Sequence, residues 1–229
     1  MQVEIVSRPA SSAARVVLRA GEMITAEVGS MVALSSGLTV ETVARQKGAG
    51  GGLLSGVKRM FAGENFFLNQ FTAQRDGAEL ILAPSLMGDI AHVPLTGGTL
   101  IVQGSSWLAS GGGVAVDATF PGFTRALFSG ERVFWVKLSG SGDALLSSFG
   151  AIYPVDVQGE YTVDTGHIVA FEDTLQFEIG KASQSLIGSF LGGEGFVCKF
   201  RGQGKLLCQT HNPPSFGAEL GPLLRPRQA

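Results

Sequence analysis

Three stretches of the chain alternate apolar and polar residues in the same way and predict three equivalent β-strands. They cover residues 33–41, 109–117 and 170–178, and each begins with Ala and closes with Glu or Asp. Apolar residues stand five and seven positions after that Ala in every stretch. A period of two is typical of a strand with one buried face. We therefore expect a half-buried strand at each of the three places.

A second pattern follows each stretch and is centred on a Gly-Glu dipeptide. The dipeptides are Gly63-Glu64, Gly130-Glu131 and Gly193-Glu194, with apolar residues three positions before each Glu and two and three positions after it. Two patterns that recur three times in the same order indicate a repeated unit. A repeat of this size is incomplete alone and packs against its neighbours.

Between the two patterns lies a short segment with the apolar spacing of a helix. The first copy covers residues 53–61, and residues 123–128 and 185–191 occupy the equivalent places. The sequence thus predicts an all-β fold with pseudo-threefold symmetry and short interspersed helices.

The repeats predict one compact domain over residues 1–229. Their approximate bounds are 1–90, 91–152 and 153–221, and a short C-terminal tail follows. Glycine accounts for 33 of the 229 residues, about twice its usual share of roughly 7%. We expect these glycines in tight turns and bulges between many short strands.

Charge and hydropathy exclude several classes of protein. A net charge of −2 provides no basic face for nucleic acid, so a nucleic-acid partner is not expected. The N-terminus lacks the basic start and long apolar core of a secretory signal, and long apolar stretches are broken by Gly and Pro. We expect a cytoplasmic protein without a membrane-spanning helix.

Four runs of residues carry a resemblance to a known family. They are Lys58–Phe67, Leu127–Glu131, Val163–Phe171 and Gly193–Cys198. Together they resemble the altered-inheritance-rate-of-mitochondria family, over most of the chain. The resemblance implies a fold like that of the tryptophan-RNA-binding attenuation protein (TRAP), a double-stranded β-helix-like sandwich present in three copies. It also implies frequent oligomers, with a trimer favoured. It assigns no enzymatic activity or catalytic residue, and the mitochondrial members are linked to inner-membrane organisation.

The repeated acids Glu64, Glu131 and Glu194 allow two interpretations. Under threefold symmetry they could converge on an axis and bind a cation through oxygen ligands. Alternatively, each Gly ends a short helix while the Glu accepts from nearby backbone N–H groups, and repeated turns favour this second interpretation.

Asp164 and His167 form the other candidate for chemistry. They could pair as a proton-transfer dyad, or Asp164 could hold a β-turn from which His167 begins the next strand, which we favour. No nucleophile signature accompanies them, and His92, His167 and His211 lack the spacing of a metal site. We expect no catalytic residue, no metal and no cofactor.

The two cysteines flank Gly202-Gln203-Gly204. A hairpin about Gln203 would place Cys198 and Cys208 on directly opposite positions. A reversible disulfide is then geometrically possible, although a cytosolic location favours two buried thiols.

The three helical segments predict an interaction surface in the form of an apolar collar with a basic fringe. It could serve as an oligomer interface, as a docking face for a membrane or a protein partner, or as a plug for the ends of the β units. Its residues are Leu53, Leu54, Lys58, Arg59, Phe61, Phe123, Arg125, Phe128, Leu186 and Phe190.

These features favour a non-enzymatic, homo-oligomeric scaffold or interaction module, with possible membrane association through the helical end. The competing hypothesis is a protein that binds a small molecule or metal, or an enzyme, with a cleft between repeats. Asp164 and His167 lie in the third repeat, which is where such a cleft would break the symmetry.

Overall fold

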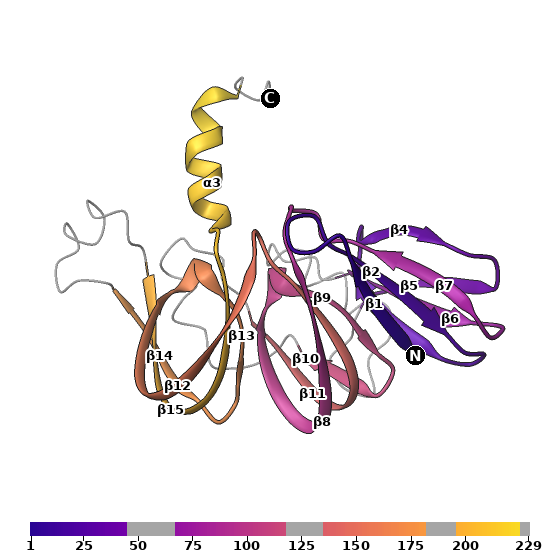
Figure 1. Ribbon diagram of the computed structural model, residues 1–229, viewed down its shortest axis with the longest axis horizontal. Coiled ribbons are helices and arrows are strands. Elements are labelled where there is room, and N and C mark those ends of the chain that lie inside the picture. Colours follow the sequence, from indigo (N-terminus) through magenta and orange to yellow (C-terminus); the bar gives the residue numbers. More distant parts are fainter. Residues whose placement is uncertain (45–66, 118–134, 182–195, 225–229) are drawn as a thin grey trace.

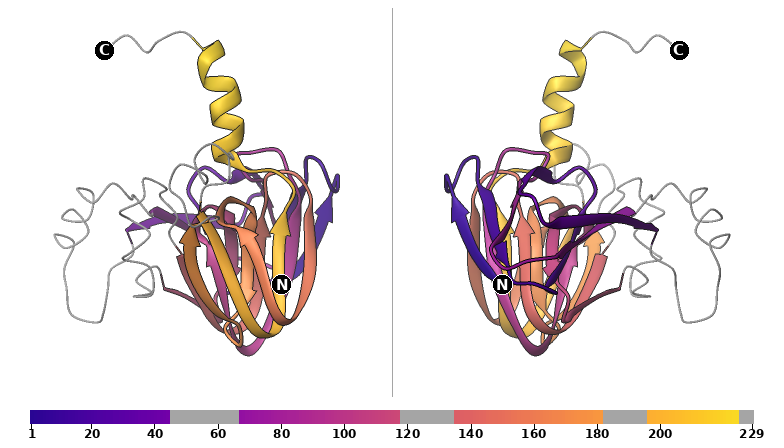
Figure 2. Two further views of the ribbon diagram at one scale, coloured as in Figure 1. Left: turned by 90° about the vertical axis from the view of Figure 1, so that its left-hand side faces the viewer. Right: turned by 90° about the vertical axis from the view of Figure 1, so that its right-hand side faces the viewer.

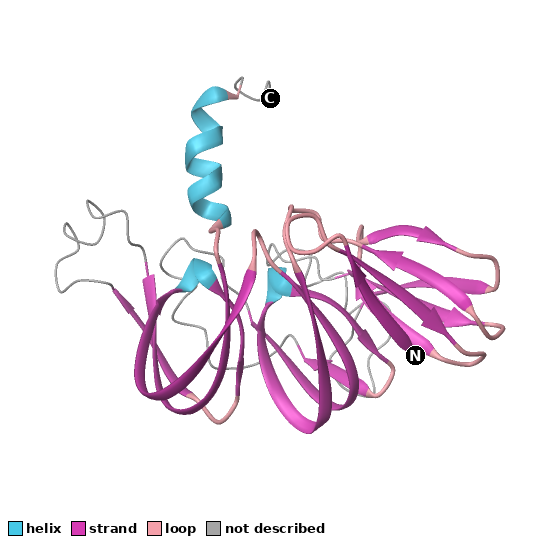
Figure 3. Cartoon of the chain, viewed as in Figure 1, coloured by secondary structure: helices cyan, strands magenta, loops and turns pink. Residues whose placement is uncertain are grey.

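A computed structural model of the chain describes residues 1–44, 67–117, 135–181 and 196–224. Strands dominate these residues (Figures 1 and 3), which confirms the all-β prediction. The described strands are β1 (Gln2–Val6), β2 (Ala13–Leu18), β3 (Met23–Glu27), β4 (Met31–Leu34), β5 (Leu38–Ala44), β6 (Phe67–Ala73), β7 (Ala78–Leu82), β8 (Ile90–Gln103), β9 (Trp107–Gly111), β10 (Val114–Asp117), β11 (Trp135–Ser147), β12 (Ile152–Asp164), β13 (Ile168–Glu172), β14 (Gln176–Lys181) and β15 (Phe196–Gln209).

The middle part of the chain is built on two long antiparallel strands, β8 and β11. They pair from Ile90 opposite Ser147 to Gln103 opposite Trp135, and the pair bends near its centre (Figure 1). At the bend Gly140 has φ +111°, and a Cβ there would lie 2.4 Å from the Gly113 carbonyl oxygen. The other edge of β11 pairs with β9 on one side of the bend and with β10 on the other.

The C-terminal part uses the same arrangement. Strands β12 and β15 pair over their whole length, from Ile152 opposite Gln209 to Asp164 opposite Val197. Strands β13 and β14 lie on the other edge of β15. Several glycines thus bend long strands, whereas the sequence pattern predicted turns between short ones.

The hairpin predicted about Gln203 is wrong. Residues 196–209 form one continuous strand, so Cys198 lies opposite Val163 and Cys208 lies opposite Tyr153. Gly202, with φ +119°, faces Gly159, with φ +100°, and this glycine pair lets both strands bend without reversing. Both cysteines are buried and unbridged, and burial raises the pKa of the Cys198 thiol to about 12 and that of Cys208 to about 11.

In the N-terminal part, two pairs of short strands take the place of the single pair of long strands. Strand β2 pairs with β7, and β3 pairs with β6. Residues 74–77 connect β6 to β7 at the place where the other two parts have the Gly-x-Gly bend. Strand β4 pairs with β7, and β5 pairs with β6.

Two strand pairings join the three parts into a row (Figure 1). Strand β3 pairs with β9, and β8 pairs with β13. Buried apolar side chains form a cluster within each part, with Phe71, Trp107 and Phe171 among their largest members. The side views in Figure 2 show that the strands of the row curve in the same way along its length.

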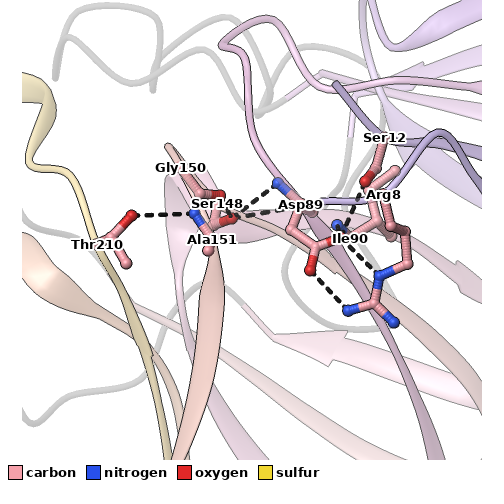
Figure 4. A network of polar contacts seen from close by, with 8 residues as sticks. All are labelled: Arg8, Ser12, Asp89, Ile90, Ser148, Gly150, Ala151 and Thr210. Atoms are coloured by element: carbon pink, nitrogen blue, oxygen red, sulfur yellow. Dashed lines mark hydrogen bonds and ion pairs between the residues drawn. The ribbon is translucent and has the colours of Figure 1, made fainter. Parts of the chain in front are cut away.

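A buried carboxylate also links the parts. Asp89 accepts hydrogen bonds from the Arg8 guanidinium at 2.8 and 2.6 Å and from the Ser12 hydroxyl at 2.9 Å (Figure 4). Its backbone N–H donates to the Ser148 hydroxyl at 3.1 Å, in the segment between β11 and β12. Burial opposes ionisation, but the donors from Arg8, Ser12 and the Ile90 backbone hold the pKa of Asp89 below its usual value.

The C-terminal tail contains a helix that the sequence patterns did not predict. Helix α3 (Pro213–Leu220) rises from the end of β15 and stands away from the strands (Figures 1 and 2). The Asn212 side chain caps its first turn, and Pro stands at its first positions, which is a common way to begin a helix.

Candidate functional site

A groove of about 470 Å³ lies beside the C-terminal half of β12. Polar and aromatic side chains dominate its wall, so the groove could hold a partner through hydrogen bonds and ring contacts. Its lining residues are Tyr153, Tyr161, Thr162, Val163, Asp164, His167, Gln209 and Thr210.

Asp164 and His167, the pair that the sequence predicted as a candidate for chemistry, both line this groove. Each side chain contacts a backbone group. Asp164 Oδ1 accepts from the Gly166 N–H at 2.7 Å and caps the short 3-10 turn Thr165–His167. His167 Nδ1 contacts the Gln209 carbonyl oxygen at 2.9 Å. Because a carbonyl oxygen accepts, Nδ1 is the donor there, and Nε2 is the acceptor in the neutral ring. Asp164 also accepts from the Asn212 amide at 3.3 Å.

Gln209 also lines the groove, and no sequence pattern predicted it. Its amide donates to the Gly166 carbonyl oxygen at 2.8 Å, and its Oε1 accepts from the Phe149 N–H at 2.8 Å. The side chain is buried. A glutamine at the end of an apolar strand carries no signal of this role, because both of its partners come from distant parts of the chain.

The outer edge of β12 beside the groove is not paired with any described strand. Strand β12 pairs with β15 on its inner edge, and the sheet ends there. Tyr161 on this edge is 42% exposed. An unpaired strand edge presents backbone donors and acceptors to any strand that approaches it.

The other end of the row carries an exposed apolar strand. All four residues of β4 are exposed, and Val32 is 62% exposed. Strands β9 and β13 hold the same position in their parts of the chain, but their residues are almost all buried. Within the described residues β4 pairs with β7 alone. An apolar strand that lies open to solvent marks an interaction surface.

Other residues predicted from the sequence lie outside the described part of the chain. They comprise Glu64, Glu131 and Glu194 and the apolar collar with its basic fringe (Leu53, Leu54, Lys58, Arg59, Phe61, Phe123, Arg125, Phe128, Leu186 and Phe190). Among residues 1–44, 67–117, 135–181 and 196–224, no group of three or more His, Cys, Asp or Glu side chains could hold a metal ion. The same residues contain no helix that is long and apolar enough to cross a membrane.

The fold and its edges define an all-β, sandwich-like protein in which one sheet of eleven described strands extends through the N-terminal, middle and C-terminal parts. The family described as "Mitochondrial biogenesis AIM24" matches residues 3–211, and the chain belongs to that family. The predicted family resemblance is therefore confirmed.

Two proteins of Streptococcus pyogenes are similar to the chain. An uncharacterised protein of serotype M6 is 30% identical over 207 residues, which cover 89% of this chain and 83% of that protein. The X-ray crystal structure of protein SPYM3_0169 superposes with a TM-score of 0.80 at 25% identity and covers 97% of this chain and 99% of the other.

Proposed function

We propose that this protein is a non-enzymatic, homo-oligomeric scaffold or interaction module. The observation that carries the proposal is the apolar strand β4, which is exposed although its counterparts β9 and β13 are buried. A protein that acts as a monomer has no reason to leave such a strand open at a sheet edge, because it invites association. Self-association would bury it.

We further propose that the architecture is a TRAP-like unit present three times with pseudo-threefold symmetry. The same register shift supports this proposal in all three parts. Strand β4 skips one residue where it pairs with β7, as β9 does where it pairs with β11 and β13 does where it pairs with β15. The skipped residues are Val32, Leu108 and Val169, and Ala33, Ala109 and Ala170 follow them. A bulge is a designed feature of a strand, so three bulges at matching places indicate one repeated unit.

The oligomer is tested by its mass. Size-exclusion chromatography with light scattering, supported by native mass spectrometry, should show a trimer, three times the chain mass of 23.9 kDa. The trimer should persist on dilution to low micromolar concentration. A protein that remains a monomer at every concentration would contradict the proposed function.

A second candidate is a small polar ligand in the groove beside β12. The favouring observation is the set of polar groups on its wall, with the His167 ring oriented by the Gln209 carbonyl oxygen. Differential scanning fluorimetry against a library of small polar compounds would test it. A ligand that raises the melting temperature of the wild type, but not that of His167→Ala, would support this function. No shift across the library would oppose it.

Membrane association through the predicted collar is the remaining part of the proposal. The supporting residues Lys58, Arg59 and Arg125 carry positive charge beside apolar positions in the sequence. Sedimentation with vesicles that contain anionic lipid should pull down the wild type at low salt. Protein that stays in the supernatant would remove this part of the proposal.

A further inference from the structure

The two junctions inside the chain are built in one way. At the first, Ile24 of β3 lies opposite Gly111 of β9, and Ala26 lies opposite Ala109. At the second, Leu100 of β8 lies opposite Glu172 of β13, and Val102 lies opposite Ala170. In each case the bulged short strand of one part adds to the first long strand of the part before it.

Each end of the row lacks one half of such a junction. Strand β4 is a bulged short strand without a preceding part, and the C-terminal half of β12 is a first long strand without a following part. These two edges lie at opposite ends of the row in Figure 1, so they do not meet within one chain.

Burial shows what the missing halves would cover. Val32 is 62% exposed, whereas Leu108 and Val169, which hold the same bulge position, are both 0% exposed. Tyr161 is 42% exposed, whereas Leu100 at the matching place in β8 is 7% exposed. The two open edges thus correspond to the surfaces that are buried at the inner junctions.

We propose that β4 of one copy adds in antiparallel orientation to the C-terminal half of β12 in a second copy. The inner junctions set the register, because Val163 precedes its 3-10 turn by two residues as Val102 does, and Ala33 follows its bulge as Ala170 does. Ala33 then lies opposite Val163, Leu34 opposite Thr162, and Ser35 opposite Tyr161. This inference rests on the proposed oligomer and specifies its interface.

The groove beside β12 is the slot for the incoming strand. Four consecutive residues of its wall, from Tyr161 to Asp164, form the unpaired edge itself. The segment Met31–Leu34 carries no charge, so it brings no ion of its own into the groove, whose wall includes the Asp164 carboxylate. Backbone hydrogen bonds would supply affinity, as in other cases of strand addition.

The proposed junction is head-to-tail, because it uses two different surfaces of the same chain. A contact of this kind closes into a ring when the rotation between copies allows it. A closed ring of any number of copies would leave no open edge, and the proposed trimer is one such ring.

Single charged substitutions test the two edges separately. Val32→Asp and Tyr161→Asp each place a carboxylate in the junction, where it would be buried without a partner, and about 100-fold weaker association is expected. Val40→Asp is the matched control, since Val40 is 44% exposed on β5, which lies at another sheet edge. Both junction variants should run as monomers at low micromolar concentration, and the control should keep the wild-type mass. Circular dichroism and thermal unfolding should show all three variants folded, because each residue is exposed in the single chain.

Mixing the two junction variants tests the head-to-tail arrangement. Val32→Asp retains an intact β12 edge, and Tyr161→Asp retains an intact β4 edge. Their mixture should form a complex of one copy of each, with twice the chain mass and no larger species. A symmetric contact would give no such rescue, and a mixture that stays monomeric would overturn the head-to-tail junction.

A cysteine pair tests the register in the otherwise wild-type chain. Ala33→Cys mixed with Val163→Cys should form an intermolecular disulfide under mild oxidation, because directly opposite Cβ atoms lie roughly 4.5–5.5 Å apart. Ala33→Cys mixed with Gly159→Cys, further along β12, should give little product. Equal cross-linking of the two mixtures would contradict the register. A monomeric wild type would defeat the proposed oligomer, whereas a wild-type oligomer that survives Val32→Asp and Tyr161→Asp would defeat the β4–β12 junction alone.

Discussion

Arg8 and Asp89 form a two-point ion pair across the boundary between the N-terminal and middle parts of the chain. The Asp89 side chain is 2% exposed, whereas that of Arg8 is 54% exposed. The carboxylate also accepts from Ser12, and its own N–H donates to Ser148, so the pair lies at the centre of a network that connects the segment before β2 to the segment between β11 and β12 (Figure 4). Loss of charge at Asp89 should therefore weaken the connection between the parts.

The substitution Asp89→Asn should lower the free energy of unfolding by about 2–4 kcal/mol, because it removes the charge that Arg8 and Ser12 stabilise. The pKa of Asp89 is lower in the folded state, so its contribution is present above the unfolded pKa and disappears as the pH falls through the folded pKa. Urea unfolding at pH 7 and pH 3 measures both effects. Arg15→Ala is the control, since its ion pairs lie on the surface, where solvent screens them, and its removal should change stability much less than Asp89→Asn does. Equal stability of Asp89→Asn and the wild type at pH 7 would contradict the role of the network.

Ionisation of Glu27 should destabilise the folded protein, whereas ionisation of Asp89 should stabilise it. Burial raises the pKa of this carboxyl group to about 7. As the pH rises from about 4.5 to 7, the unfolded chain releases this proton more readily than the folded chain does. The free energy of unfolding of the wild type should therefore fall by roughly 1–3 kcal/mol. Glu27→Gln should remove this loss and be more stable than the wild type above pH 7. Unfolding curves of the two proteins between pH 4.5 and pH 8 provide the test, and a constant difference between them would refute the assignment.

The bend in the middle part should depend on Gly140. Its φ of +111° and the nearby Gly113 carbonyl oxygen exclude a side chain, so Gly140→Ala should lower the free energy of unfolding by about 2–4 kcal/mol. Gly98→Ala is the matched control on the partner strand, where a Cβ would meet nothing within 4 Å. The control should change stability by less than about 1 kcal/mol. Guanidinium unfolding of both variants decides between a steric requirement and a tolerant turn.

Both cysteines should be unreactive in the native protein. Cys198 and Cys208 are buried on one strand, and burial raises both thiol pKa values to about 11 or above. Reaction with Ellman's reagent at pH 8 should therefore be at least about 100-fold slower than for the unfolded chain. In guanidinium both thiols should react. Rapid reaction of one thiol in the folded protein would show that its strand opens locally.

Periodicity predicted the all-β class, and the turn chemistry of Asp164 and His167 pointed to two of the residues that line the candidate groove. The single half-buried strand predicted over each of residues 33–41, 109–117 and 170–178 is wrong, because each stretch covers the end of one strand, a turn and the start of the next. The alternation of apolar and polar residues does not show where a short turn interrupts it. The resemblance carried by residues such as Val163–Phe171 led to the correct family. The pairing of Cys198 with Cys208 failed for a physical reason, because Gly202 permits a reversal and a bend equally well. The contacts made by neighbouring strands decide between the two.

The sequence by itself determined the all-β class, the family, and the position of Asp164 and His167 at a strand end. Tertiary structure alone decided which edges meet. Strands β4, β9 and β13 have similar apolar character, yet β4 is exposed and the other two are buried. Burial depends on a neighbour that comes from a distant part of the chain, and β4 has none among the described residues. That difference is a property of the assembled row, and the open ends of the row are the surfaces that a second copy would cover.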